Sequence, residues 1–442
     1  MTLRTLTLGA FAAVLAAGTV TVAPAPASAQ DQVFIPLLTY RTGGFAGSGI
    51  PIADGMGDYL RMLNERDGGI GGARLVIEEC ETGYATTKGV DCSETLKGKN
   101  PVVMTPYTTG STPQKAAVDK IPVLSMAYGL SASAVGNVFP WIFNPPVTYW
   151  DGASAFIKHV ADKEGGFDKL KGKKIGLIHL DAPFGKEPIA LLENLAKEYG
   201  FELKLYPIAA ADMQNQGSTW LAIRRDRPDW IYNQGWGAMN PTAVKEAVKN
   251  NFPMEKLVGV WWAGGDDDAR AGAEGAKGYK SLNFHAAGAN FPVIQDIIKH
   301  VADKGKSTAP KEKIGENLYN RGVYNSMLIA EAIRTAQKIT GKKAVTGEDV
   351  RRGFEALNIT EARLKEMGME GFAAPVKITC DDHNGHNNVY VAQWDGTKYV
   401  KGSDWFSPMK DKVRPLLESA AADYAKSNAG WPQRTEACEK GS

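Results

Sequence analysis

The sequence predicts an α/β protein with two lobes, each built around a parallel sheet. Short apolar runs, typical of buried strands, alternate with helical patterns along most of the chain. Strands separated by helices favour parallel sheets, because parallel neighbours need a crossover connection. A chain of 442 residues is also too long for one compact core, so two lobes are expected.

The N-terminal segment has the pattern of a secretory signal peptide. Arg4 precedes an apolar run over residues 6–22, and Ala27-Ser28-Ala29 provides the small residues of a cleavage site. No cysteine follows this run before Cys80, which argues against a lipid anchor. We therefore expect residues 1–29 to be removed and the mature chain to be exported; a membrane-anchoring helix is the alternative. No later stretch approaches the roughly 20 apolar residues of a membrane span.

Strands and helices alternate from the start of the mature chain. The expected elements are a strand over 33–38, a helix with Ile52, Met56, Tyr59, Leu60 and Leu63 on one face, a strand over 75–77, a helix over 86–96, and strands over 102–104 and 122–124. A glycine-rich turn over 42–49 leads into the first helix, and Gly68-Gly69 ends it.

A second series of elements begins near Asp151. It comprises helices over 151–164, 188–199, 219–225 and 242–250, and strands over 174–180, 202–206, 230–232 and 257–262. From about Ser281 the pattern is mainly helical, with a helix carrying Ile294, Ile297, Ile298 and Val301, another over 321–338, and a third that begins near Thr346-x-x-Asp349. Residues 388–393 and 398–400, joined by Asp395-Gly396, predict a hairpin.

The composition is that of an ordinary globular protein, with 43% hydrophobic and 23% charged residues. The formal net charge is +2, and no basic run is long enough to follow a phosphate backbone. Nucleic acid and anionic membranes are therefore not expected as partners.

The four cysteines favour disulfides, because their number is even and the chain is expected to be exported. Closeness in sequence favours the pairs Cys80–Cys92 and Cys380–Cys438 over the two crossed pairings. Cys380 also lies near His383 and His386, which raises a zinc site as the alternative. A structural zinc site needs a fourth ligand, so we favour a disulfide followed by an Asn-Gly turn and expect no metal.

No motif argues for an enzyme or for a cofactor. The sequence has no G-x-S-x-G elbow, P-loop or H-E-x-x-H motif. The glycine-rich turn over 68–72 lies between a helix and a strand, whereas a phosphate loop follows a strand and opens a helix. The run Asp266-Asp267-Asp268 could hold a hard cation, but we favour capping of a short helix by these carboxylates.

Two segments carry a resemblance to a known family. Residues 53–64 and 68–76 resemble the first helix and the following turn of the leucine/isoleucine/valine-binding proteins, the periplasmic receptors of branched-chain amino-acid ABC transporters. The resemblance continues through Cys80 and Cys92, residues 103–112, 121–125, 174–185 and 228–232, and Asp382-His383, so it covers essentially the whole mature chain. It implies a periplasmic location.

The resemblance implies two Rossmann-like lobes joined by a hinge of three crossovers, with the ligand held between lobes that close on it. The crossovers would fall near residues 143–146, 279–283 and 374–379. The N-terminal lobe would comprise residues 30–145 plus 281–375, and the C-terminal lobe residues 146–280 plus 376–442. Independently of the family, ligands of open α/β sheets bind beyond the carboxyl ends of the strands.

The resemblance also implies a set of ligand-binding residues. Hydroxyl and N–H groups for a carboxylate would come from the loop 108–112, with Thr109 best placed, and from residues 127–129; helix capping by that loop is a compatible alternative. Aromatic residues would come from the opposite lobe. The full expected set is Thr108, Thr109, Ala127, Tyr128, Gly129, Phe184, Trp236 and Trp262.

One departure from the family pattern bears on the ligand. The family's acidic residue that holds the ligand ammonium follows the strand that ends near Trp262, but here no acid comes before Asp266. A buried ammonium without a counter-charge costs several kcal/mol. We therefore expect a carboxylate with an apolar or aromatic body, which aromatic rings suit. The alternative is that Asp266 or Asp267 reaches back to an amine and the ligand is a branched-chain amino acid.

The expected function is that of a substrate-binding protein of an ABC importer. It would act as a monomer, capture a small molecule without altering it, and dock on permease subunits in the inner membrane. A sensory protein that docks on a signalling receptor is an alternative that shares the same site. An exported hydrolase would need a nucleophile with a nearby base, and the loop 108–112 has no histidine that the sequence places beside it.

Overall fold

The computed structural model describes residues 1–2, 31–106, 118–125 and 129–438. Residues 31–442 cluster as one compact unit, and residues 1–30 as another. The predicted signal peptide falls almost entirely outside the described residues and stays a prediction. In the described ranges, no helix is both long enough and apolar enough to cross a membrane.

The first lobe is built on a small parallel sheet. Its strand order is β2 (Arg74–Glu81), β1 (Gln32–Thr39), β3 (Thr105–Pro106), with both neighbours parallel to β1. A parallel pair, β4 (Val123–Leu124) and β5 (Ile142–Phe143), continues the sheet through a bridge between Met104 and Val123. β1 is buried along most of its length, as expected for a parallel strand covered on both faces.

Helices from distant parts of the sequence cover this sheet. They are α1 (Ala46–Asp67), α2 (Thr86–Lys97), α10 (Pro292–His300), α11 (Asn317–Thr340) and α12 (Gly347–Glu355). α13 (Glu361–Glu366) and the short antiparallel pair β11 (Asn358–Ile359) and β12 (Val376–Lys377) follow α12. α12 begins with a capping box between Thr346 and Asp349, which confirms the helix start predicted from that motif.

The second lobe contains a sheet of seven strands. In spatial order they are β14 (Tyr399–Lys401), β13 (Tyr390–Trp394), β10 (Lys280–Asn283), β9 (Leu257–Gly259), β8 (Trp230–Gln234), β6 (Lys174–Leu180) and β7 (Glu202–Ile208). β7, β6, β8, β9 and β10 run parallel, and β13 and β14 form an antiparallel hairpin at one edge. The hairpin confirms the sequence prediction.

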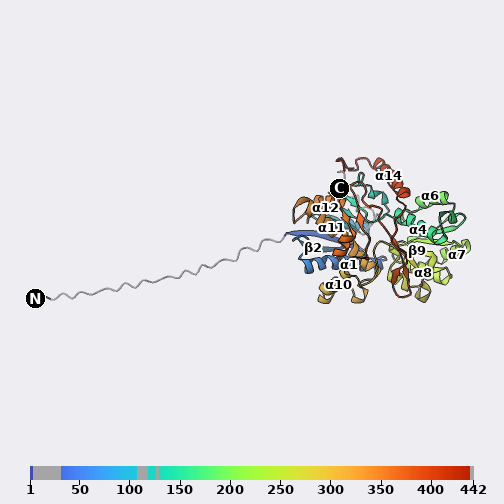
Figure 1. The fold of residues 1–442 in the computed structure, drawn as a ribbon, viewed down its shortest axis with the longest axis horizontal. Coiled ribbons are helices and arrows are strands. Elements are labelled where there is room, and N and C mark those ends of the chain that lie inside the picture. The colour runs from blue at the N-terminus through green and yellow to red at the C-terminus, as the bar shows by residue number, and fades with distance from the viewer. Residues whose placement is uncertain (3–30, 107–117, 126–128, 439–442) are drawn as a thin grey trace. The chain divides into compact units, whose positions relative to one another are not determined.

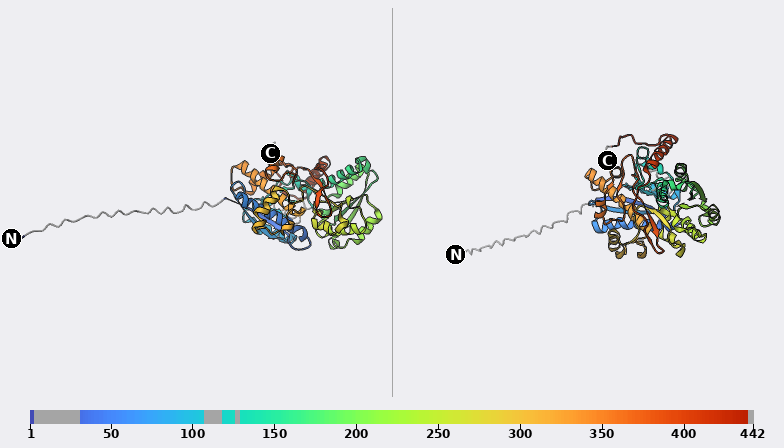
Figure 2. Two further views of the ribbon diagram at one scale, coloured as in Figure 1. Left: turned by 60° about the horizontal axis from the view of Figure 1, so that its bottom comes forward. Right: turned by 45° about the vertical axis from the view of Figure 1, so that its right-hand side comes forward.

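The helices of this lobe come from the middle of the chain. They are α4 (Tyr149–Glu164), α5 (Pro183–Lys186), α6 (Ile189–Tyr199), α7 (Gly217–Asp226), α8 (Met239–Lys249) and α9 (Asp266–Arg270). α14 (Lys410–Ser427) packs against α4 and α6. Figure 1 shows α1, α10, α11 and α12 grouped with β2, and α4, α6, α7 and α8 grouped around β9. Figure 2 shows the same two groups from other sides, so the predicted α/β fold with two lobes is confirmed.

One expectation about the elements is wrong. The strand predicted over 257–262 ends at Gly259, and residues Trp261–Ala263 form a 3-10 helix, η5. The Ala263 N–H donates to the Val260 carbonyl at 2.8 Å, and this turn keeps both tryptophans buried, whereas a strand would have pointed them to opposite faces. The mainly helical pattern expected from about Ser281 is present, because α10, α11, α12 and α13 follow β10.

The connection that follows β5 and the connection that precedes β13 meet at a buried polar cluster around Asp151. After β5 the chain passes through a cis peptide bond between Pro145 and Pro146 and enters α4. The Asp151 carboxylate accepts hydrogen bonds from the Thr148 N–H and from Asn384 Nδ2, both at 2.8 Å. Asn384 belongs to the third connection between the lobes, the segment that joins β12 to β13. The Asp151 carboxylate therefore links this third connection to the first connection, which joins β5 to α4.

Both disulfides favoured by the sequence are present. Cys80–Cys92 joins β2 to α2, with Cα atoms 5.9 Å apart, and Cys380–Cys438 joins the third connection to the C-terminal tail, with Cα atoms 5.6 Å apart. Because Cys380 is in a disulfide, it provides no thiolate for zinc. Within the described ranges, no group of three His, Cys, Asp or Glu side chains is placed to hold a metal ion.

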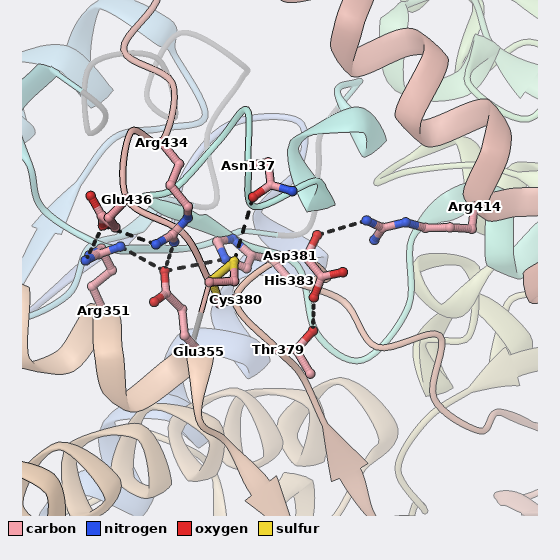
Figure 3. Close-up of a disulfide and its surroundings, with 11 residues drawn as sticks. Asn137, Arg351, Glu355, Thr379, Cys380, Asp381, His383, Arg414, Arg434 and Glu436 are labelled. Carbon is pink, nitrogen blue, oxygen red and sulfur yellow. Dashed lines mark hydrogen bonds and ion pairs between the residues drawn. A yellow bond between two sulfur atoms is a disulfide. The ribbon is translucent and has the colours of Figure 1, made fainter. Parts of the chain in front are cut away.

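Ion pairs hold the same tail against α12 (Figure 3). Arg434 pairs with Glu355, and Glu436 lies 3.0 Å from Arg351, which in turn pairs with Glu355 at 2.9 Å. Glu355 is buried, and burial raises its pKa while the two guanidinium groups lower it. The tail therefore fastens the third connection to the first lobe through both covalent and ionic contacts.

The α1–α11 contact requires glycine. A Cβ at Gly322 would lie 2.1 Å from the Ile52 carbonyl oxygen and 2.6 Å from the Met56 nitrogen, both backbone atoms. Gly322→Ala should therefore force the helices apart and lower the free energy of unfolding by about 2–3 kcal/mol. Urea unfolding monitored by circular dichroism measures this loss. Gly217→Ala is the control, because a Cβ there meets nothing within 4 Å; an equal loss in both variants would contradict the packing argument.

The two disulfides close loops of different length, with sequence separations of 12 and 58 residues. Loop-closure entropy predicts a loss of about 3 kcal/mol for Cys80→Ser/Cys92→Ser and about 4 kcal/mol for Cys380→Ser/Cys438→Ser. Denaturant titration of the two double variants checks the order. A larger loss for the shorter loop would show that chain entropy does not govern these bonds.

Candidate functional site

Aromatic residues follow the carboxyl ends of strands in both sheets. Tyr40 directly follows β1, and Tyr84 comes three residues after β2. In the second lobe, Trp236 follows β8, Trp262 follows β9 and Phe184 follows β6. This is the edge at which open α/β sheets bind ligands.

These rings contact one another and form an aromatic cluster. We define it by its members: Tyr40, Phe45, Tyr84, Tyr149, Phe184, Trp236, Trp261 and Trp262. Trp236 lies at its centre, with ring centroids 5.9 Å from Tyr40, 6.0 Å from Tyr84 and 4.9 Å from Trp262. Tyr40 and Tyr84 belong to the first lobe and the tryptophans to the second, so the cluster spans both lobes.

Tyr149, the first residue of α4, links the cluster's polar groups. Its hydroxyl accepts a hydrogen bond from Trp262 Nε1 at 2.7 Å, and its ring lies 4.9 Å from Phe184 and 5.3 Å from Trp261. Burial raises its pKa well above the usual value, so the hydroxyl stays neutral. The neighbouring charges that act on it come from Glu187 and Arg321.

Arg321 of α11 places a positive charge against the cluster. Its guanidinium lies over the rings of Trp262 and Phe284, 5.1 and 4.2 Å from their centroids. It donates to His285 Nε2 at 2.6 Å and to Asn283 Oδ1 at 2.8 Å. Burial and the arginine charge lower the pKa of His285 well below its usual value, so the imidazole is neutral and accepts this bond.

The two lobes touch beside the cluster at two glycines. Gly237 lies against Phe45: its φ is +58°, and a Cβ there would lie 2.5 Å from Phe45 Cδ1. Gly129 lies against Pro183: its φ is +97°, and a Cβ would lie 2.7 Å from the proline Cβ. The lobes therefore meet on both sides of the aromatic rings.

The structure also brings an acidic residue to this contact. Glu187, directly after α5, accepts a hydrogen bond from the Ser131 N–H at 3.1 Å. Burial raises the pKa of Glu187 to about 7, although hydrogen bonds from the Ser131 side chain and from the N–H groups of Ser131 and Gly129 oppose the shift. The sequence analysis missed this residue; its signal was an acid three positions after Phe184, in the segment that follows β6.

The sequence-predicted site residues fall into two groups. Thr108, Thr109, Ala127 and Tyr128 lie outside the described residues. Of the others, Gly129 lies against Pro183 and the backbone of Phe184, and Trp236 contacts Trp262. Whether these residues bind a ligand stays a prediction. Sequence reasoning did not single out Tyr40, Phe45, Tyr84, Tyr149 or Arg321; the positions of Tyr40 and Tyr84 just after strands were the available signal.

The acidic run after η5 serves helix capping. Asp266 accepts the Asn317 N–H at 2.7 Å and so caps α11, and the Asp268 carboxylate accepts the Gly265 N–H at 3.2 Å at the start of α9. Asp267 pairs with Arg270 at 2.5 Å and with Lys313 at 2.9 Å. Capping was the favoured interpretation of this run, and it is confirmed.

A separate cavity of about 950 Å³ lies at the other end of β1, lined by residues that include Gln32, Phe34, Lys97 and Thr346. It adjoins the amino end of the strand and the start of α12. Open α/β sheets bind ligands at the carboxyl ends of their strands, whereas this cavity lies at the amino end. We therefore place the candidate ligand site at the aromatic cluster.

The carboxyl ends of parallel strands from both sheets meet at one aromatic cluster. This arrangement is typical of a two-lobed ligand-binding protein. The chain belongs to the periplasmic binding protein family, whose model matches residues 32–399. This is the family of ABC transporter solute-binding proteins, and it agrees with the resemblance found in the sequence.

Solved structures support this assignment. A crystal structure described as an ABC transporter permease from the Pseudomonas fluorescens group is 38% identical, with a TM-score of 0.86, over 92% of this chain and 99% of that one. A branched-chain amino-acid ABC transporter protein from Thermus thermophilus with bound valine is 18% identical, with a TM-score of 0.71, over 88% and 99%. A solute-binding protein from R. palustris in complex with benzoate is 18% identical, with a TM-score of 0.64, over 85% and 97%. A comparison with curated protein sequences gave no match.

Proposed function

We propose that this protein is the periplasmic receptor of an ABC importer and captures a small carboxylate with an apolar or aromatic body. The observation that carries this proposal is the aromatic cluster, which joins both lobes at the carboxyl ends of their strands. Flat rings favour an apolar or aromatic ligand body, because offset and edge-on contacts between rings contribute binding free energy beyond that of the buried area.

The charges near the cluster support an acidic ligand. Arg321 lies against Trp262 and contributes a positive potential. The predicted hydroxyl loop 108–112 and the segment 127–129 supply neutral donors for a carboxylate. The benzoate and valine complexes cited above are carboxylate complexes of proteins with this fold, and they suggest the range of ligands to test.

Ligand capture requires the lobes to separate. Trp236 and Trp262 are only 3% and 1% exposed, so a solute reaches them through an opened form in which Gly237 and Phe45 move apart. Closure around the ligand would then present both lobes to permease subunits. We further propose that the protein acts as a monomer, that it resides in the periplasm, and that it does not alter its ligand.

A ligand screen tests the proposed class. Thermal shift with benzoate, 3-phenylpropionate and 4-methylpentanoate should raise the melting temperature, since a ligand at a hundredfold excess over Kd adds about 2.7 kcal/mol. Benzamide and acetate are matched controls that lack the charge and the apolar body, respectively. Mass spectrometry of the ligand that copurifies should show an unaltered acid. Stabilisation by benzamide but by no carboxylate would refute the proposal.

Replacing the central ring tests the site. Trp236→Ala should weaken binding of the best carboxylate from the screen at least tenfold, equivalent to about 1.4 kcal/mol, because it removes ring contacts from both lobes. Isothermal titration calorimetry measures the affinity, and Trp236→Phe, which keeps a ring, should retain part of it. Trp431→Ala in the C-terminal tail is the control for loss of a partly buried indole. Full affinity in Trp236→Ala would place the ligand elsewhere.

A further inference from the structure

We propose that α14 and the C-terminal tail that follows it, residues 410–438, form a strap that joins the two lobes and limits how far they separate. The strap begins on the second lobe, passes along the third connection and ends on the first lobe. The inference goes beyond the proposed function, because it concerns how readily the lobes open and holds whichever ligand they bind.

The start of the strap is fixed to the second lobe. Lys412 of α14 pairs with Glu198 of α6 at 2.6 Å. Directly before α14, the Met409 N–H donates to Ser154 Oγ of α4 at 3.0 Å. α14 packs against both of these helices, and it buries completely the apolar side chains of Val413, Leu417 and Ala421.

The first half of α14 also contacts the third connection. Lys410 and Arg414 lie 3.0 and 3.3 Å from the Asp382 carboxylate, and Arg414 donates to the Asp381 carbonyl at 2.9 Å. The same Asp381 carbonyl accepts the Gly136 N–H of the first lobe at 3.1 Å. The strap therefore passes from the second lobe to a segment that is itself bound to the first.

The end of the strap is fixed to the first lobe. The ring of Tyr424, in the last turn of α14, lies 4.9 Å from the ring of Phe139. In the tail, the Arg434 N–H donates to the Asn137 carbonyl at 2.9 Å, and the Arg434 guanidinium pairs with Glu355 of α12. These partners all belong to the first lobe.

The Cys380–Cys438 disulfide keeps the end of the strap in place. Figure 3 shows Arg414 on one side of Cys380 and Arg434 on the other, so ionic contacts hold the strap on both sides of this bond. Separation of the lobes would move α4 relative to α12, so contacts at one end of the strap would have to break or α14 would have to bend. A buried ion pair that loses one partner leaves a costly unpaired charge. The strap therefore raises the free energy of opening.

Hydrogen exchange measured by mass spectrometry tests the proposal on the mature protein, freed of any ligand that copurifies. The Asn317 N–H of α11 reports lobe separation, because it donates to the Asp266 carboxylate of the second lobe. Neither residue belongs to the strap or to the segments that hold it. In Cys380→Ser/Cys438→Ser we expect the peptide that contains Asn317 to exchange about threefold to tenfold faster than in the wild type.

Three further variants show whether release of the strap is the cause. Cys80→Ser/Cys92→Ser removes the disulfide within the first lobe and should leave exchange of this peptide unchanged in the absence of denaturant. Trp431→Ala should also exchange like the wild type, because the disulfide and the ion pairs still hold the tail. Arg434→Met breaks the pair with Glu355 but keeps the disulfide, so we expect a smaller increase than in Cys380→Ser/Cys438→Ser.

The outcomes separate this inference from the proposed function. Wild-type exchange in a folded Cys380→Ser/Cys438→Ser variant would overturn the strap, and so would an equal increase in both double cysteine variants, since that shows only a general loss of stability. If Cys380→Ser/Cys438→Ser does not fold, unchanged exchange in Arg434→Met would overturn it instead. Failure of every carboxylate in the ligand screen would refute the proposed ligand class and leave the strap standing.

Discussion

The buried carboxylate of Asp151 sets the geometry on which the site depends. It accepts from the Thr148 N–H and Asn384 Nδ2, and its Oδ1 lies 2.5 Å from His386 Nδ1. These contacts fix the start of α4 against the segment that leads into β13. Tyr149 lies at that start, so the same carboxylate that joins two connections also positions the hydroxyl that organises the aromatic cluster. A buried acid with several partners tolerates little displacement, because each lost partner leaves a costly unpaired group.

The contact between the lobes requires glycine at two positions, because a side chain there would collide with the opposite lobe. At Gly237 and Gly129, the backbone has positive φ and a Cβ would collide with Phe45 or Pro183 of the opposite lobe. The lobes also meet at the buried aromatic cluster and at Arg321 of α11, which donates to Asn283 and lies over Trp262. The interior of the first lobe is different, because α1 and α11 are in close backbone contact over buried side chains. Opening of the lobes would have to break these ring and arginine contacts, whereas the contact between α1 and α11 lies within one lobe and would stay intact.

The acidic run Asp266–Asp268 and Glu187 make different kinds of contact. The run Asp266–Asp268 stabilises the starts of α9 and α11, where free N–H groups favour negative charge. Glu187 instead accepts the Ser131 N–H from the opposite lobe. Its raised pKa reflects burial, which hydrogen bonds from the Ser131 side chain and from the N–H groups of Ser131 and Gly129 offset only in part.

The sequence by itself determined the features that arise within a few residues. Alternating strands and helices, the capping box at Thr346, the hairpin around Asp395-Gly396 and the Cys80–Cys92 pair, 12 residues apart, follow from local periodicity, turn chemistry and short separations. The fold class followed as well, because parallel strands need crossovers. The tertiary structure alone decided that the strand β9 ends before Trp261. It alone brought Glu187 to Ser131, 56 residues away in sequence. It also brought Arg321 to Asn283 and His285. These contacts join segments whose local patterns carry no information about each other, so only the packing of the two lobes could bring them together.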